Sequence, residues 1–484
     1  MRGNVEDKRI CAGCVGEKYL KGLVAKTGVR ETCAYCGKKG KTLSIGELAE
    51  DHIRGAFERH YRRTPLGPPE SEEYMYRESD IGWERPGDQA AYAIADAAGL
   101  GDDAAEDARS VLEENTFVSP DDYFDSDGEG EFSEESQYEE IDADATELYQ
   151  DWLYFQKTLK TETRLFNSAA AAVLHSIFDG LDGHATRKGG KVVVNAGPGE
   201  KLSALYRSRV FQSDAKLEEA LKRPDLGLGP PPAKVATAGR MNARGIAVFY
   251  GATHSDVAIS ETRPPVGSRV LVARFEIIRP LKLLDLVALR SIFVKGSIFD
   301  PLHLARLKKA AFLATLGDQA TKPVMPDDEP FEYLVTQAIA DYLANLDDPK
   351  LDGIIYRSVQ NGKTKNNVVL FHKASSVKPL DIPPGTEISA HLFEHDEDGV
   401  RPDYWVFENV PGPEDEDDLG SDFPVLGLPN LRHRNDSRDP ALSIDMASLR
   451  VHHIERAQYS STAFTPTRHR SQRSKGIKRV KPIL

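Results

Sequence analysis

Apolar residues recur at helical intervals through the amino-terminal half of the chain. The segment SIGELAEDHIRGAFERHYRR has this spacing, and shorter patches of the same kind cover Gln89–Leu100 and Ala104–Leu112. A longer pattern runs from residue 145 to residue 181, as a bundle helix or a helix pair requires. These patterns predict a helical domain over residues 46–186.

The pattern changes after the connector GGKVVVNAGPGEK. Short apolar runs rich in β-branched residues follow, which is typical of strands. They read GIAVFY, RVLVARFEII, DGIIYRS and NVVLF. We therefore predict an α+β domain over residues 196–412.

Charged segments interrupt and end this arrangement. The acidic run DDYFDSDGEGEFSEESQYEE is expected to be largely loop, and the acidic and then basic tail of residues 413–484 is expected to be poorly ordered. The stretch Asp121–Asp144 is interpreted as a solvated linker. The alternative is that it covers a pocket of the same chain and inhibits it.

Composition narrows the classes of function. The 484 residues carry a formal net charge of -14, which argues against a dedicated nucleic-acid coat or a membrane-surface protein. No stretch approaches the roughly 18 to 20 apolar residues that a membrane span needs, and the start MRGNVEDKRICAG lacks the apolar run of a secretory signal. We expect a cytoplasmic protein without a membrane partner. Nucleic acid stays open as a partner because local basic patches remain.

All 4 cysteines lie near the amino terminus, in two CxxC pairs. Cys11 and Cys14 are separated from Cys33 and Cys36 by 18 residues, within the spacing typical of structural zinc sites. Four protein ligands close the coordination sphere, so zinc here is expected to fold residues 1–45 and not to activate water. The alternative is four free thiols.

Arg54 and His60 form a second amino-terminal candidate within IRGAFERHYRR. The pair resembles the Arg-to-His signature of HEPN ribonucleases, in which the two side chains act together on an RNA phosphate. Six residues turn an α-helix through about 240°, so the two do not share a face without help from another chain. The alternative is two exposed polar residues on an amphipathic helix.

Three blocks in the carboxyl-terminal half carry a more specific pattern. They are LYRSR from Leu205, AGRMNARGIAVFYGATHSDVAISETRPPVG from Ala238, and DGIIYRSVQNGKTKNNVVLF from Asp352. Together they resemble the RES domain, named for the Arg, Glu and Ser that recur in it. Met241 stands where the family usually has Trp, in a position expected to serve packing.

The resemblance implies a fold related to ADP-ribosyltransferase toxins and an enzyme that cleaves the nicotinamide-ribose bond of NAD. The amino-terminal half likewise resembles the zinc-knuckle and HEPN-like extension found fused to some RES domains, through CxxC, CAYCG and WLYFQKTLKTETRLFN. The implied fold is therefore a zinc knuckle and helical domain followed by an ADP-ribosyltransferase-like α+β domain.

Four residues match the catalytic positions that the resemblance implies. A carboxylate at Glu261 would stabilise positive charge on the ribose, and a guanidinium at Arg240 would clamp the pyrophosphate. The ring of Tyr250 would hold the cationic nicotinamide by stacking. Ser358 would orient the ribose or the carboxamide.

Four further residues are interpreted as dinucleotide contacts. Arg207 would be a second phosphate clamp, and Gly239 would let the backbone approach the ligand closely. Asn242 and Asn367 complete the family's order of residues.

Several activities and partners stay open at this level. The favoured function is an NAD glycohydrolase or phosphorylase of the toxin or defence type, paired with an antitoxin or another inhibitory protein. One alternative is a mono-ADP-ribosyltransferase that modifies a protein, and another is a HEPN-like protein that binds or cuts RNA. A homo-oligomer is also open.

Overall fold

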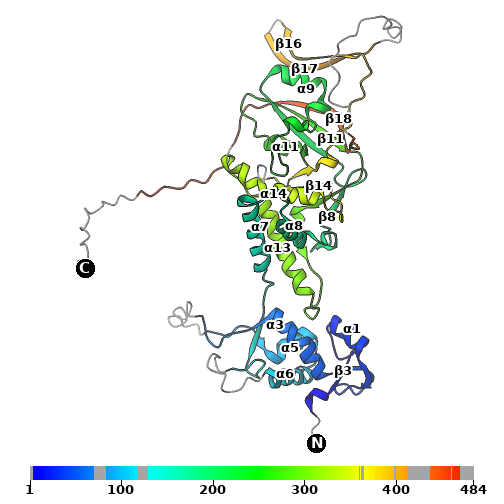
Figure 1. Ribbon diagram of the computed structural model, residues 1–484, viewed down its shortest axis with the longest axis vertical. Coiled ribbons are helices and arrows are strands. Elements are labelled where there is room, and N and C mark those ends of the chain that lie inside the picture. Colours follow the sequence, from blue (N-terminus) through cyan, green and yellow to red (C-terminus); the bar gives the residue numbers. More distant parts are fainter. Residues whose placement is uncertain are drawn as a thin grey trace, which may run out of the picture.

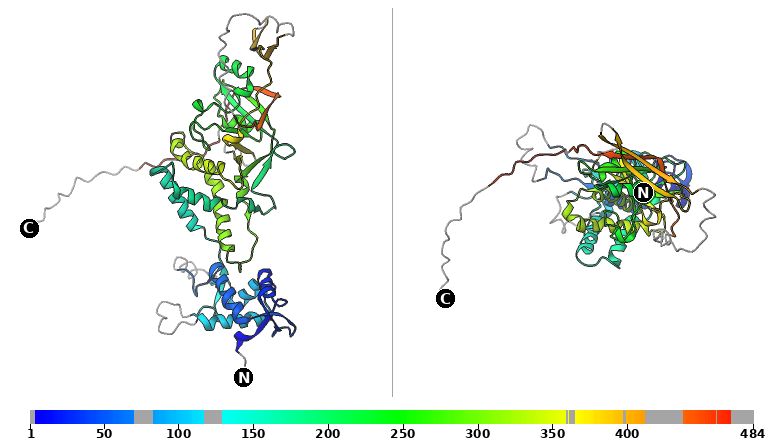
Figure 2. Two further views of the ribbon diagram at one scale, coloured as in Figure 1. Left: turned by 45° about the vertical axis from the view of Figure 1, so that its right-hand side comes forward. Right: turned by 90° about the horizontal axis from the view of Figure 1, so that it is seen from above.

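The computed structural model describes residues 4–69, 83–116, 129–358, 360, 365–396, 399–411, 437–458 and 460–468. Two folded units lie end to end along the long axis of the molecule (Figures 1 and 2). Helices and strands occur in both units, so the predicted α+β class is confirmed. None of the described helices is long and apolar enough to cross a membrane.

The first unit, residues 4–141, joins the cysteine module to a helical layer. Its sheet has the order β1-β3-β2, and a second small sheet has the order β4-β6-β5. The strands are β1 (Arg9–Cys11), β2 (Val29–Thr32), β3 (Lys39–Ser44), β4 (Tyr61–Arg63), β5 (Asp88–Gln89) and β6 (Gln137–Glu140). The helices are α1 (Lys18–Thr27), α2 (Ile45–Leu48), the π-helical turn Ala49–Arg54, α3 (Gly55–His60), α5 (Ala90–Ala98) and α6 (Asp102–Thr116).

A single core runs through this first unit. Ile10 and Leu20 from the cysteine module pack with Ile53, Ile94 and Leu112 from the helical layer. The small cysteine-rich sheet thus buries its apolar face against the helices that follow it, and the core continues across the boundary predicted at residue 45. Part of the acidic stretch also differs from expectation, since Gln137–Glu140 forms β6, while residues 117–128 lie outside the described residues.

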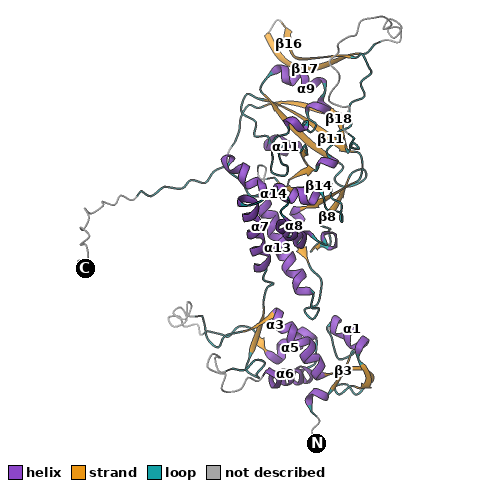
Figure 3. Ribbon diagram, in the orientation of Figure 1, coloured by secondary structure: helices purple, strands orange, loops and turns teal. Residues whose placement is uncertain are grey.

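The helices predicted as the second half of the amino-terminal domain belong to the second unit. They form α7 (Thr146–Thr161) and α8 (Ser168–Phe178), which group with α13 (His303–Thr321) and α14 (Glu329–Ala344) in Figure 3. Trp152 and Phe155 of α7 share a core with Leu313 and Ile339. The apolar face of α7 is buried against α13 and α14, so the core continues across the boundary predicted at residue 186.

The helix pair breaks between residues 161 and 168, where the periodic pattern had continued. Leu165 and Phe166 lie in this turn and are 77% and 102% exposed, and Phe166 has a φ of 57°. Asn167 caps α8 by accepting a hydrogen bond from the Ala170 amide at 2.9 Å. Apolar spacing alone therefore did not reveal the end of the first helix.

An eight-stranded sheet forms the centre of the second unit, with the order β18-β11-β9-β10-β15-β14-β12-β8. Its strands are β8 (Val193–Ala196), β9 (Ala204–Phe211), β10 (Phe249–Ala252), β11 (Arg269–Ile277), β12 (Leu281–Asp285), β14 (Gly353–Arg357), β15 (Asn366–Leu370) and β18 (Leu442–His453). Neighbouring strands are antiparallel except for β12 and β14, which are parallel. Strands β9 and β10 share only the pair of Ala252 with Tyr206, so the sheet opens between them.

The remaining elements surround this sheet. They are α9 (Asp214–Lys222), α10 (Pro224–Gly227), α11 (Ser255–Glu261), α12 (Leu286–Leu289) and the hairpin of β16 (Glu387–Asp396) and β17 (Gly399–Asn409). Strands β7 (Ala185–Thr186) and β13 (Ile292–Phe293) form a separate pair. A loop before α13 reaches the first unit, where Phe299 is buried in that unit's core.

The expectation that residues 413–484 lack order is wrong for β18. This strand pairs with β11 from Leu442 to His453 and forms one edge of the sheet. Ala441, Leu442 and Ile444 are buried in its core. The basic end of the tail, from residue 469 onward, lies outside the described residues.

Candidate functional site

A cavity of about 500 Å³ lies beside the opening between β9 and β10. Residues of β9, β10, β14, β15, α11 and α14 line it. A volume of this size is typical of ligand pockets. Because β9 and β10 separate here, side chains from both can point into one space.

Tyr250 on β10 is fixed by the loop that precedes its strand. Its Oη accepts a hydrogen bond from the Met241 amide at 2.9 Å and donates to Asn242 Oδ1 at 2.8 Å. Burial raises the pKa of Tyr250 to about 12, so the phenol stays neutral near pH 7. The hydroxyl thus holds the loop, and the ring remains as the part of Tyr250 that can contact a ligand.

Asn242 organises the same loop from within. Its Nδ2 donates to the carbonyl oxygens of Thr237, Ala243 and Ile246 at 2.9, 3.2 and 3.0 Å. The side chain is buried, with its Oδ1 occupied by Tyr250. Asn242 does not line the cavity. The geometry therefore does not support the expected role of Asn242 as a dinucleotide contact. Asn242 instead positions the loop and Tyr250.

Gly239 has a steric reason to lack a side chain. A Cβ at this position would lie 2.6 Å from Asn242 Oδ1 and 2.7 Å from Tyr250 Oη, closer than atoms of this kind approach. Its carbonyl oxygen accepts a hydrogen bond from Gln337 Nε2 on α14 at 2.8 Å. The glycine therefore allows the loop to pass closely over Tyr250.

Arg240 follows this glycine and reaches the cavity from the loop. Its guanidinium lies 5.0 Å from the ring centre of Tyr333 on α14, and its Nη2 donates to the Lys322 carbonyl at 2.9 Å. Thr336 donates a hydrogen bond to the Arg240 carbonyl. These contacts orient the guanidinium toward the cavity that it lines.

Arg207 on β9 lies deeper in the sheet. Its guanidinium stacks 4.7 Å from the ring centre of Phe249 and donates to the Tyr250 carbonyl at 3.3 Å. Burial, and secondarily the charge of Arg209, lower the pKa of Arg207 to about 10. The side chain still carries its positive charge near pH 7 and faces the cavity.

Glu261 is held by two buried side chains. Its Oε1 accepts hydrogen bonds from Ser358 Oγ at 2.6 Å and from Asn367 Nδ2 at 2.8 Å. Ser358 and Asn367 are 2% and 4% exposed. Among the described residues, Oε2 has no hydrogen-bond partner, so one carboxylate oxygen is anchored and the other is available to a ligand.

The structure thus brings most of the predicted residues to one place. Arg207, Arg240, Tyr250, Glu261 and Asn367 all line the cavity. Ser358 stands behind Glu261 and outside the lining, and Gly239 and Asn242 stand behind Tyr250.

Sequence reasoning missed several lining residues. Tyr333 and Glu329 come from α14, which lies between the recognised blocks, and Arg263 follows α11 with a φ of 44°. Tyr356 and Arg357 lie inside DGIIYRS, where alternation along a strand could have indicated them. The lining carries four arginines, at 207, 240, 263 and 357, against the two glutamates at 261 and 329.

The four cysteines cluster as their spacing predicts. Sγ of Cys11 lies 3.8 Å from that of Cys14 and 3.6 Å from that of Cys36, and Cys14 lies 3.8 Å from Cys33. All four sulfurs fall within 4.8 Å of one another. Zn–S bonds of roughly 2.3 Å at tetrahedral angles place sulfurs about 3.8 Å apart, so the cluster fits such an ion.

Arg54 and His60 have unrelated surroundings. Arg54 pairs with Glu50 at 2.6 Å, whereas His60 is 3% exposed and its ring lies 6.1 Å from that of His303 in the second unit. The expectation of two exposed residues is therefore wrong for His60. The chain that separates the two residues is α3 (Gly55–His60), so the turn arithmetic for an α-helix applies to the pair.

Comparison with known proteins gives one match. The family model of the RES domain matches residues 205–391, which contain all eight residues predicted for the cavity. No curated protein and no solved structure matches the chain.

Proposed function

Because residues 205–391 form a RES domain, we propose that this protein is an enzyme that cleaves the bond between nicotinamide and ribose in NAD. The observation that carries the proposal is the shared cavity of Arg240, Tyr250 and Glu261. We propose an NAD glycohydrolase or phosphorylase of the toxin or defence type.

The chemistry of the bond accounts for a carboxylate at this place. When the C1′–N1 bond breaks, its electron pair moves to the cationic ring, nicotinamide leaves as a neutral molecule, and positive charge develops on the ribose. A fixed carboxylate stabilises that charge electrostatically. Ser358 and Asn367 hold one oxygen of Glu261, so the carboxylate is oriented before substrate binds. Water or phosphate then adds to C1′ and gives up a proton.

The arginines suit the pyrophosphate of the same substrate. Guanidinium groups bind phosphate oxygens through paired donors, and Arg207 and Arg240 approach the cavity from different elements. Burial makes the charge of Arg207 less screened by water. The Tyr250 ring, whose hydroxyl is already used by the loop, offers a face for the nicotinamide.

The test is incubation of the purified full chain with NAD, followed by chromatography for free nicotinamide. Glu261→Gln keeps an oxygen that can accept from Ser358 and Asn367 but removes the charge. We expect its kcat to fall about 10²- to 10³-fold, the loss typical when one electrostatic contact to a transition state is removed. Glu219→Gln on α9, an exposed carboxylate outside the cavity, is the matched control.

Wild-type protein that leaves NAD intact, with free nicotinamide absent under all acceptors tried, would overturn the proposal. Parallel reactions with water alone, with inorganic phosphate and with a protein acceptor distinguish the glycohydrolase, the phosphorylase and the ADP-ribosyltransferase by their products.

We also propose that Cys11, Cys14, Cys33 and Cys36 hold a structural zinc ion. The spacing of the sulfurs and the thiolate donor set support this ion. Because all four ligands come from the chain, the ion would stabilise the first unit. The measurement is the metal content of the purified chain, with about one zinc per chain expected.

A further inference from the structure

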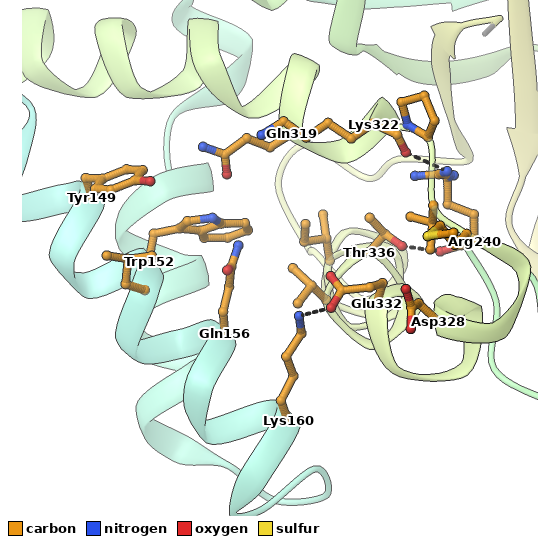
Figure 4. Close-up of a pocket in the computed structure, with 16 residues that line it drawn as sticks. Tyr149, Trp152, Gln156, Lys160, Arg240, Gln319, Lys322, Asp328, Glu332 and Thr336 are labelled. Atoms are coloured by element: carbon orange, nitrogen blue, oxygen red, sulfur yellow. Dashed lines mark hydrogen bonds and ion pairs between the residues drawn. The ribbon is translucent and has the colours of Figure 1, made fainter. Parts of the chain in front are cut away.

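A second cavity adjoins the first and is lined by a helix outside the RES match. It has a volume of about 420 Å³ and lies between α7, the end of α13 and α14. Arg240 and Pro323 line both cavities. In Figure 4, Trp152 and Gln156 of α7 face Thr336 across this space, and Arg240 stands on the far side.

The polar side chains of this second cavity include two glutamine amides, the pair of Lys160 with Glu332, and the charged groups of Lys322 and Asp328. The amides of Gln156 and Gln319 have no hydrogen-bond partner among the described residues. Lys160 is neutralised by Glu332 at 2.6 Å. Amide groups that can both donate and accept match a neutral, planar, nitrogen-rich ring, whereas the arginine-rich first cavity matches phosphate.

Trp152 forms part of the wall of this cavity. The residue is 1% exposed, and in the part of the chain that the structure describes its Nε1 makes no hydrogen bond. Phe155 and Phe312 pack against the indole at 4.9 and 5.8 Å between ring centres and fix its position. The Nε1 atom is itself enclosed, so the indole contributes an apolar wall to the cavity and no donor to a ligand.

Resting on the proposed function, we propose that the cavity between α7 and α14 binds the adenine end of NAD. Arg240 then lies at the pyrophosphate, because it stands where the two cavities meet. The nicotinamide half occupies the first cavity, with Glu261. Helix α7 lies outside the RES match at 205–391, so the amino-terminal part of the chain contributes directly to recognition of the substrate.

The experiment compares NAD with nicotinamide mononucleotide, which contains the same scissile bond but lacks the adenosine half. We expect wild-type kcat/KM to be at least about tenfold higher for NAD, because only NAD can use the second cavity. In Gln156→Ala and Gln319→Ala the KM for NAD should rise about two- to tenfold, the effect of one lost hydrogen bond, with mononucleotide turnover unchanged.

Lys157→Ala is the matched control, because Lys157 neighbours Gln156 on α7 but is exposed and outside the lining. Equal loss on both substrates, or unchanged KM for NAD in both glutamine variants, would overturn the adenine site while leaving nicotinamide release intact. A wild type that releases no nicotinamide from either compound contradicts the proposed function instead. In that case titration of the protein with AMP tests the adenine site independently of NAD cleavage. AMP binding that Gln156→Ala weakens supports the adenine site, and absence of AMP binding overturns it.

Discussion

The two units of this protein use arginine and its partner residues in different ways. In the first unit Arg54 pairs with Glu50, and His60 is enclosed between the core and His303. In the second unit Arg240, Tyr250 and Glu261 come from a loop, a strand and a helix and line one cavity. Residues that match a motif therefore form a site only where the backbone leaves a space that they share.

The difference follows from how each unit is packed. The sulfur cluster and short helices of the first unit surround one continuous core. The sheet of the second unit opens between β9 and β10, where a single residue pair joins the strands. A ligand in the cavity beside this opening can contact the parts of β9 and β10 that do not pair with each other.

Removing one thiolate should unfold the first unit and spare the second. The binding free energy of structural zinc is roughly 10 to 16 kcal/mol in zinc-finger peptides, and it adds to the free energy of folding. Loss of a zinc ligand in Cys33→Ser should therefore remove most of the stability of residues 4–141. Hydrogen exchange measured separately on peptides of the two units checks this. Lys38→Ala, an exposed neighbour of the cluster, is the control. Loss of protection in β10 and β15 together with the first unit would contradict the division into two units.

Gly239→Ala should disturb the loop that holds Tyr250. The added Cβ would meet Asn242 Oδ1 and Tyr250 Oη at 2.6 and 2.7 Å. Overpacking of this kind costs about 1 to 3 kcal/mol, and we expect nicotinamide release to fall at least about tenfold. Gly183→Ala serves as control, because a Cβ added at Gly183 would meet no atom within 4 Å. Unchanged melting and activity in Gly239→Ala would show that the loop is looser than the contacts indicate.

Ser358→Ala should lower kcat without changing KM, because Ser358 orients Glu261 and does not line the cavity. One hydrogen bond to a charged group contributes about 1.5 to 3 kcal/mol, which corresponds to a loss of about tenfold or more. Ser358→Thr, which keeps the hydroxyl, should restore most of the rate. Ser260→Ala on α11 is the control, since its Oγ bonds only to the Val257 carbonyl. A rise in KM alone would assign Ser358 to substrate binding.

The smallest effect concerns pH and the contact between the units. Burial lowers the pKa of both His60 and His303. The charges of His303 and Arg59 lower the pKa of His60 further, and Arg306 lowers that of His303, while Asp300 opposes the shift at His303. The unfolded chain takes up protons that the folded chain excludes once the pH falls below about 6.5, so stability decreases from there toward acid pH. We expect the decrease in melting temperature between about pH 7.5 and 5.5 to be smaller in His303→Gln than in wild type. An equal reduction in the exposed control His452→Gln would remove the assignment to this pair.

The periodic segments were the most predictable part of the fold. Residues 89–100 and 104–112 became α5 and α6, and three of the four apolar runs became β11, β14 and β15. The run GIAVFY differs, because only Phe249 and Tyr250 enter β10 while Ala247 and Val248 are buried in the preceding loop. An apolar run indicates burial, and tertiary packing decides whether the buried backbone is a strand.

The residues of the candidate site could be predicted where a sequence motif contains them. Roles that depend on three-dimensional contacts could not be predicted. Motif order indicated Arg240, Tyr250 and Glu261, which line one cavity. Motif order could not indicate that the Asn242 side chain donates its hydrogen bonds to carbonyl groups of the loop. Nor could it indicate that Tyr333, on a helix distant in sequence, stacks on Arg240. These facts depend on side-chain direction and on contacts distant in sequence.

Strand β18 determines when one edge of the central sheet is covered during synthesis of the chain. It is the last described strand, and it covers β11, the neighbour of β9 with Arg207. A chain that ended before residue 442 would leave β11 with an uncovered row of backbone donors and acceptors, and exposed edges of this kind recruit other chains. During synthesis the central sheet therefore stays open at this side until residues 442–453 have been made, and products truncated before residue 442 are expected to aggregate.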